Sequence, residues 1–182
     1  MLEIFNTIVS TLWLLLPTYT PNNFAVLVGG GKPLDFGKTF VDGKRILGDG
    51  KTIRGFVGGI VGGLLIANLQ YGVEKSLNFQ IFSLLTYNEF LFLVFLLSFG
   101  AITGDALGSF LKRRFGYKRG DVFPVVDQLM FLAIAFIFAS FSSSFFKLFD
   151  LIKIVIAFII TPPLHLITNY IAYKAGLKNV PW

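Results

Sequence analysis

The sequence predicts an all-α integral membrane protein: one polytopic membrane domain, residues 1–182, with five transmembrane helices. Three observations predict this fold class. The composition is 54% hydrophobic and only 14% charged, whereas an ordinary soluble domain is about 25% charged. Five apolar runs occupy most of the chain, and the basic residues gather between them. So few charges cannot cover the exterior of a water-soluble fold.

Each predicted span is an apolar run long enough to cross a bilayer as a helix, which takes roughly 20 residues. The first run has no charge, but Pro17 and Pro21 interrupt it, so it predicts one kinked or broken helix. The third run carries only Asp105, and the fourth carries only Asp127. The five expected spans cover about residues 4–31, 55–73, 90–111, 122–146 and 154–173.

The basic residues predict the orientation of the spans. Thirteen of the 16 lysines and arginines lie in loop one (32–54), in loop two (112–121) or after residue 173. The other three are Lys75, Lys147 and Lys153, on the opposite side. Lysine and arginine favour the cytoplasmic side of a membrane. We therefore expect an N-terminus outside the cell, a cytoplasmic C-terminus, and two cytoplasmic basic loops that form the site in the cell membrane.

Two spans carry glycine at every fourth position. Small residues at this spacing let helices approach closely in lipid, and we expect spans two and three to pack on these faces. The glycines are Gly55, Gly59 and Gly63 in one span and Gly100, Gly104 and Gly108 in the other.

Asp105 and Asp127 are expected at nearly equal depth, about 9 and 7.5 Å inside the cytoplasmic ends of two antiparallel spans, at 1.5 Å per residue. An ionised acid in a bilayer is costly unless it is paired or faces water. With no cysteine and one histidine in the chain, the available metal ligands are oxygens, which favours Mg²⁺. The alternative is an ion pair, for instance with Lys112 or Arg113.

Loop one reads GGGKPLDFGKTFVDGKRILGDGKTIRG, with glycines and basic residues interleaved. Glycine lets backbone N–H groups approach an anion, and lysine and arginine neutralise it. The segment is not a P-loop, because the glycine that this motif requires is replaced by Arg45 and no strand precedes it. With the five cations of loop two directly below two acids, the pattern fits phosphoryl or nucleotidyl transfer.

The two loops together resemble the archaeal CDP-archaeol synthase family. The resemblance rests on NNFAVLVGGGKPLDFGKTFVDGKRILGDGKTIRG, followed by GDALGSFLKRRFGYKRGDVFPVVDQ, and covers essentially all of the chain. The family is similar to CDP-diacylglycerol synthases. Ser109, Lys112 and Arg113 fit the start of their signature, Asp127 fits an acid near its end, and Asp105 fits an upstream metal-binding acid. Lys51, Thr52 and Gly55 resemble a KTxxG element, whose position differs here.

The resemblance implies a Mg²⁺-dependent cytidylyltransferase. CTP and unsaturated archaetidic acid, di-geranylgeranylglyceryl phosphate, would give CDP-archaeol and pyrophosphate in phospholipid biosynthesis. The lipid phosphate is already an anionic nucleophile, so no general base is needed. We expect Asp105 and Asp127 to hold the metal, and Lys112 and Arg113 to bind the lipid phosphate or the leaving pyrophosphate. The residues expected to contact CTP from loop one are Lys44, Arg45, Lys51, Thr52 and Arg54.

Asn23 is expected either to orient a ligand or to act as a structural cap, and Asp49 is expected to tether the loop to a neighbouring cation. Two alternatives stay open: the same chemistry on an ester lipid, and a small cation or phosphate transporter, since transporters also carry intramembrane acids and broken helices. The position of the acids near the cytoplasmic end favours an enzyme. The expected partners are CTP, the lipid phosphate and membrane lipids, with no nucleic acid and no protein partner inferred.

Overall fold

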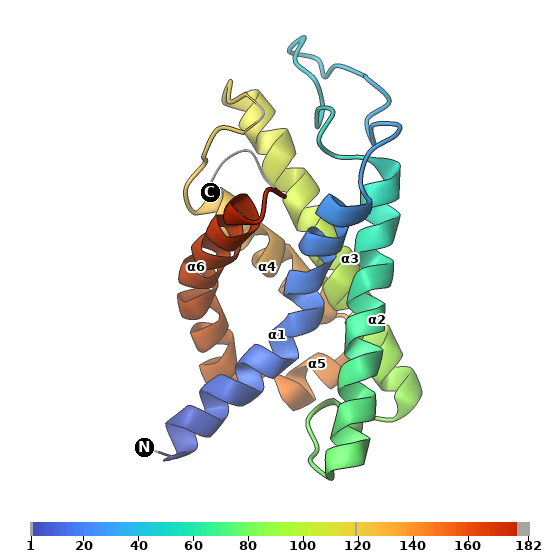
Figure 1. Ribbon diagram of the computed structural model, residues 1–182, viewed down its shortest axis with the longest axis vertical. Coiled ribbons are helices and arrows are strands. Elements are labelled where there is room, and N and C mark those ends of the chain that lie inside the picture. Colours follow the sequence, from blue (N-terminus) through green and yellow to red (C-terminus); the bar gives the residue numbers. More distant parts are fainter. Residues whose placement is uncertain (1, 119, 178–182) are drawn as a thin grey trace.

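The computed structural model describes residues 2–118 and 120–177, which form six α-helices and one short 3₁₀ helix (Figure 1). The elements are α1 (Leu2–Val28), α2 (Ile53–Leu77), η1 (Phe82–Leu84), α3 (Tyr87–Arg114), α4 (Val126–Ala139), α5 (Ser143–Leu148) and α6 (Leu151–Lys174). Arg119 and Lys178, two of the expected cytoplasmic cations, lie outside the described residues. The all-helical prediction is confirmed.

Three helices in the described part of the chain, α2, α3 and α6, are long and apolar enough to cross a membrane. The predicted single span over 122–146 is wrong, because α4 has only 14 residues and a second helix, α5, follows it. Ser142 starts α5 as its N-cap and accepts a hydrogen bond from the Ser144 N–H at 3.3 Å. Serine side chains favour such helix starts, so the polar segment breaks the apolar run.

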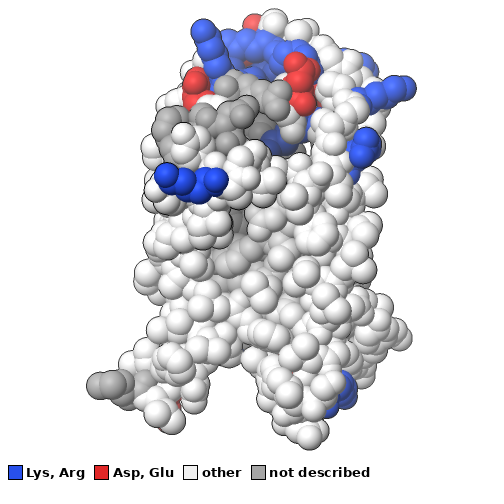
Figure 2. Space-filling model, viewed as in Figure 1, with Lys and Arg blue, Asp and Glu red and all other residues white. Residues whose placement is uncertain are grey.

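Both basic loops lie at one end of the molecule, beside the C-terminal end of α6, while α1 begins at the other end (Figure 1). Lysine and arginine gather at the loop end, above an almost uncharged body (Figure 2). This distribution agrees with the predicted separation of charge between the two ends.

The prolines of α1 attach it to its neighbours. Proline has no N–H, so a helix containing it leaves the carbonyl four residues earlier without its usual donor. Pro17 frees the Trp13 carbonyl, which accepts a hydrogen bond from Gln70 of α2 at 2.8 Å. Pro21 frees the Pro17 carbonyl, which accepts from Ser98 of α3 at 3.1 Å. The helix is therefore continuous through both prolines and is fixed against α2 and α3.

The glycine faces pack closely, but not only against each other. A Cβ added at Gly59 would lie 2.7 Å from the Pro21 carbonyl oxygen of α1 and 2.9 Å from Ile102 of α3. A Cβ at Gly104 would lie 2.7 Å from the Phe131 Cα of α4. The glycines of α2 therefore face α1 as well as α3, and those of α3 face α4 rather than α2 as expected. Close packing of α3 and α4 holds the segments that carry Asp105 and Asp127.

Candidate active site

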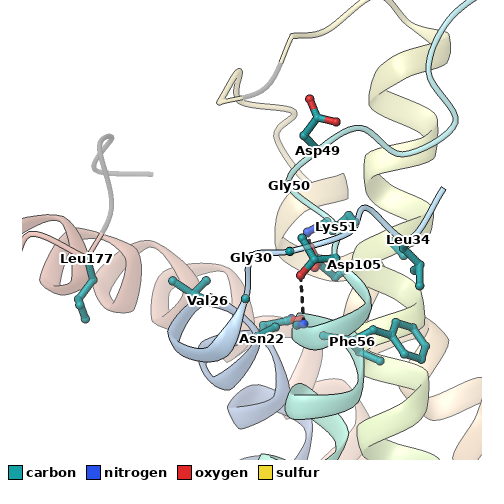
Figure 3. A pocket seen from close by; sticks show the side chains of 17 residues that line it. Asn22, Val26, Gly30, Leu34, Asp49, Gly50, Lys51, Phe56, Asp105 and Leu177 are labelled. Atoms are coloured by element: carbon teal, nitrogen blue, oxygen red, sulfur yellow. Dashed lines mark hydrogen bonds and ion pairs between the residues drawn. The ribbon is translucent and has the colours of Figure 1, made fainter. Parts of the chain in front are cut away.

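A cavity of about 470 Å³ opens at the charged end, between the end of α1, the start of α2 and the half of α3 nearest the basic loops (Figure 3). Its wall includes four of the residues that the sequence predicts for the site: Asp49, Lys51, Thr52 and Asp105. Gly29, Gly30 and Gly31, which follow α1, and Phe56 of α2 also line the cavity. The cavity thus joins the end of loop one to an acid within α3.

Backbone pairing fixes Lys51 and Thr52 at the start of α2. The Leu34 N–H donates to the Lys51 carbonyl at 2.7 Å, and the Ile53 N–H donates to the Lys32 carbonyl at 3.1 Å. The Thr52 hydroxyl caps the helix by accepting from the Gly55 N–H at 3.1 Å. The N-terminus of a helix carries a partial positive charge and attracts phosphate groups, and here it opens next to a lysine.

Asp105 forms an ion pair with Lys51 on the cavity wall. Both side chains stay partly open, with exposed fractions of 34% for Asp105 and 27% for Lys51. Ser109 lies one turn along α3, and its hydroxyl donates to the Asp105 carbonyl oxygen at 3.1 Å. Ser109 is therefore engaged with its own helix and does not line the cavity.

Asp127 lies outside the cavity wall and is paired with Lys112. The Lys112 ammonium contacts both carboxylate oxygens, at 2.7 and 2.9 Å, and the Phe123 N–H donates at 2.9 Å. The ion-pair alternative that the sequence leaves open thus describes both acids, and the partner of Asp127 is Lys112, one of the two cations named for it. Asp105 has a partner that the sequence did not indicate, Lys51.

Asp35 organises loop one from a buried position. The donors to its carboxylate are Arg45 at 2.8 and 3.2 Å, Leu47 and Gly48 N–H groups at 2.9 Å, and the Gly37 N–H at 3.0 Å. Burial opposes the charge on Asp35, but these hydrogen bonds outweigh it and hold the pKa of the carboxyl well below its usual range. Arg45 also contacts Asp49 at 2.8 Å, which is the contact expected of a tether. Held by two carboxylates, Arg45 does not line the cavity.

Three other predicted cations have different positions. Lys44 and Arg113 link loop one to the end of α3, and Arg54 lies at the rim of the cavity. Lys44 donates to the Arg114 carbonyl at 3.0 Å, and Arg113 donates to the Leu47 carbonyl at 3.4 Å. Neither side chain lines the cavity. Arg54 is exposed, and its aliphatic part lies beside the cavity residue Gly31, 3.5 Å from where a Cβ on that glycine would be.

Asn22, rather than Asn23, faces the cavity. Asn23 is exposed on another side of α1 and does not line the cavity, so its expected role in orienting a ligand is not supported by this geometry. The sequence places both amides at the same end of the span, and consecutive residues of a helix point about 100° apart. Only the rotation of α1 against α2 and α3 selects between them.

The comparisons with known proteins concern nearly the whole chain. A family model described as CarS-like, CDP-archaeol synthase, matches residues 4–182. The chain belongs to the CDP-archaeol synthase family. A CDP-archaeol synthase of Archaeoglobus fulgidus is 65% identical over 175 residues, which cover 96% of this chain and 98% of the relative. One from Methanospirillum hungatei is 45% identical and covers 92% of this chain and 100% of the relative.

A solved structure described as an intramembrane enzyme for archaeal membrane lipid biosynthesis has the same architecture. It is 31% identical, covers 89% of this chain and 94% of that chain, and has a TM-score of 0.73. Membership of the CDP-archaeol synthase family confirms the resemblance found in the two loops. It also confirms the predicted activity, a CTP-dependent cytidylyltransferase in archaeal membrane lipid biosynthesis, over the transporter alternative.

Proposed function

We propose that the cavity binds the triphosphate of CTP and that the lipid phosphate reacts there. The observation that carries this proposal is the meeting of the α2 N-terminus, Lys51 and Asp105 on one cavity wall. An oxygen of the lipid phosphate forms a bond to the α-phosphorus of CTP. The bond from that phosphorus to the oxygen bridging the β-phosphate breaks, and pyrophosphate leaves with the electron pair. The products are CDP-archaeol and pyrophosphate.

The donor set fits Mg²⁺ bound together with substrate. Asp105 and Asn22 line the cavity, and their carboxylate and buried amide oxygens are hard oxygen donors. Mg²⁺ is commonly bound by one or two carboxylates, with phosphates and water as its remaining ligands. We propose that Asp105 holds Mg²⁺ from the cavity wall, and that Asp127 of α4 would join it by releasing Lys112. Bound there, the ion would neutralise phosphate oxygens.

The two lysines that now pair with these acids are the proposed phosphate ligands. If Asp105 held the metal, Lys51 would be free to contact the triphosphate, with the N-terminus of α2 and Thr52 beside it. Lys112, released in the same way from Asp127, would stabilise the lipid phosphate or the leaving pyrophosphate. Arg54 at the rim adds positive charge. The other predicted site residues keep this wall in place through the loop and helix contacts described above. They are Lys44, Arg45, Asp49, Ser109 and Arg113.

We further propose that α1 and the α4–α5 segment complete the five spans, with the N-terminus outside and the cavity facing the cytoplasm. Support comes from the charge distribution, because the basic loops share one end and the first turn of α1 lies at the other (Figures 1 and 2). CTP is a cytoplasmic nucleotide and reaches the cavity from this side. The lipid enters from the cell membrane, with its phosphate at the level of Asp105.

The lipid acceptor is proposed to be di-geranylgeranylglyceryl phosphate, in agreement with the archaeal relatives. The test is to incubate the purified protein in detergent with radiolabelled CTP and Mg²⁺, with either this ether lipid or a diacylglycerol phosphate. A labelled lipid formed from the ether acceptor supports the proposal. Product from the ester acceptor alone would assign the other substrate, and no product from either would contradict the proposal.

A further inference from the structure

Asn22 lies on the cavity wall, and its side-chain oxygen takes part in no hydrogen bond among the described residues. It lies on α1, six residues before the helix ends at Val28, and shares the cavity with Asp105 and Lys51 (Figure 3). Its Oδ1 is buried and has no hydrogen-bond partner among the described residues. Buried oxygens of Thr18, Gln70, Ser83 and Thr103 also have no hydrogen-bond partner among the described residues. Of these residues, only Asn22 lines the cavity.

An amide oxygen removed from water without a donor destabilises a folded protein. Leucine has nearly the same size and shape as asparagine and leaves no acceptor without a partner. The position would therefore be more stable with an apolar residue, unless the oxygen gains a partner in the working protein. The unused acceptor consequently indicates a ligand rather than a packing role.

The chemistry of the cavity limits what that ligand is. An acceptor oxygen beside the Asp105 carboxylate does not attract a phosphate oxygen, because both are electron-rich. Lys51 is the cation next to it and already pairs with Asp105. A divalent cation, in contrast, is bound by carboxylate oxygens together with neutral amide oxygens and waters.

We propose that Asn22 Oδ1 is a neutral oxygen donor in the Mg²⁺ site, next to Asp105. This inference rests on the proposed function, because it assumes that Asp105 holds the metal. A neutral donor contributes to binding without adding a charge that would repel the triphosphate. It also places a ligand on α1, so the site is built by α1 and α3 together.

The test measures metal binding without turnover. Mn²⁺ replaces Mg²⁺, and the electron paramagnetic resonance signal of free Mn²⁺ is followed as it is added to the full-length protein with CTP and no lipid acceptor. Asn22→Leu is expected to weaken Mn²⁺ binding at least tenfold, with an unchanged or higher melting temperature in metal-free buffer. Asn22→Asp keeps an oxygen donor and should bind Mn²⁺ as tightly as the parent or more tightly. Asn23→Leu, on the exposed side of the same helix, is the matched control and should match the parent.

Each other outcome has one meaning. Parent-like Mn²⁺ affinity in Asn22→Leu, with weak binding in Asp105→Asn, overturns this inference and leaves the proposed metal site standing. Parent-like affinity in Asp105→Asn shows instead that the proposed metal site is wrong. Weaker binding of CTP to Asn22→Leu in the presence of EDTA makes Asn22 a nucleotide contact and overturns the inference. If Asn22→Leu does not fold, weaker Mn²⁺ binding in Asn22→Asp than in the parent overturns it.

Discussion

Lys51 and Asp105 form an ion pair although 54 residues separate them in the chain. The lysine ends loop one, directly before α2, and the acid lies within α3. The pair therefore joins the loop to the membrane-embedded part of the cavity wall. Both side chains remain partly exposed, so an incoming ligand can reach either of them.

Replacement of Lys51 tests its role in binding phosphate. Lys51→Gln removes the cation beside the α2 N-terminus, and we expect kcat/KM for CTP to fall about 100-fold, the usual loss when a donor to developing charge is removed. Steady-state assays of labelled lipid product measure this. Lys38→Gln, in the same loop but outside the cavity, is the control. Equal activity of the two variants would contradict the assignment.

Replacement of Asp127 tests whether this acid works in catalysis or only holds Lys112. We expect Asp127→Asn to abolish turnover while the protein stays folded, because both the metal and Lys112 lose their carboxylate. Turnover and the melting temperature in detergent are measured together. Retained activity would leave Asp127 with a structural role only, since its hydrogen bonds to Lys112 and the Phe123 N–H would then be its whole contribution.

Asp35 gives loop one a pH-dependent stability. The pKa of Asp35 is lowered in the folded protein, so its contribution is fully present above the unfolded pKa of about 3.9 and is lost as the pH falls through the lower folded value. Asp35→Asn presents an amide to three backbone N–H groups, and we expect a loss of about 2 kcal/mol at pH 7. The difference from the parent should shrink in thermal unfolding below about pH 4.

The control for this prediction is Asp42→Asn. Asp42 pairs with Arg114 at 3.2 Å, but its side chain is 34% exposed, and such pairs contribute about 1 kcal/mol or less. A loss for Asp42→Asn as large as that for Asp35→Asn would show that burial is not what distinguishes the two acids. A difference between Asp35→Asn and the parent that stayed constant with pH would show that the charge on Asp35 is not responsible.

The contact between α3 and α4 is tested at Gly104. A Cβ there would lie 2.7 Å from the Met130 carbonyl oxygen, so Gly104→Ala must move the helices apart, at a cost of about 1–3 kcal/mol, and we expect lower turnover. Gly72→Ala is the matched control, because no atom lies within 4 Å of its added Cβ. It should be neutral or stabilise by up to about 1 kcal/mol through helix propensity. Equal melting temperatures for the two variants would contradict the close packing.

Much of the fold could be predicted because it depends on local composition. The apolar runs indicate helices, and the lysines and arginines mark one end of the bundle. The break between α4 and α5 could not be read from hydropathy, because phenylalanines surround the Ser142 cap and keep the average apolar. The three short polar residues Ser142, Ser143 and Ser144 were the available signal.

The sequence predicts which residue types form the site, but it does not predict which side chains contact each other. Residue types identified Asp105 and Lys51, yet their pairing depends on how loop one folds back onto α3. Arg45 looked like a phosphate ligand in a glycine-rich loop, but Asp35 and Asp49 occupy it. The choice of Asn22 over Asn23 depends on the rotation of a proline-containing helix, which packing against two neighbours sets.

The most direct measurement is the turnover of Asp105→Asn with radiolabelled CTP, Mg²⁺ and di-geranylgeranylglyceryl phosphate, at saturating concentrations. The substitution keeps the shape of the side chain and removes the charge in the cavity. We predict that formation of labelled CDP-lipid falls at least about 1,000-fold while the melting temperature stays close to that of the parent. Turnover within about tenfold of the parent would contradict the claim that this carboxylate holds the metal and triphosphate for the reaction.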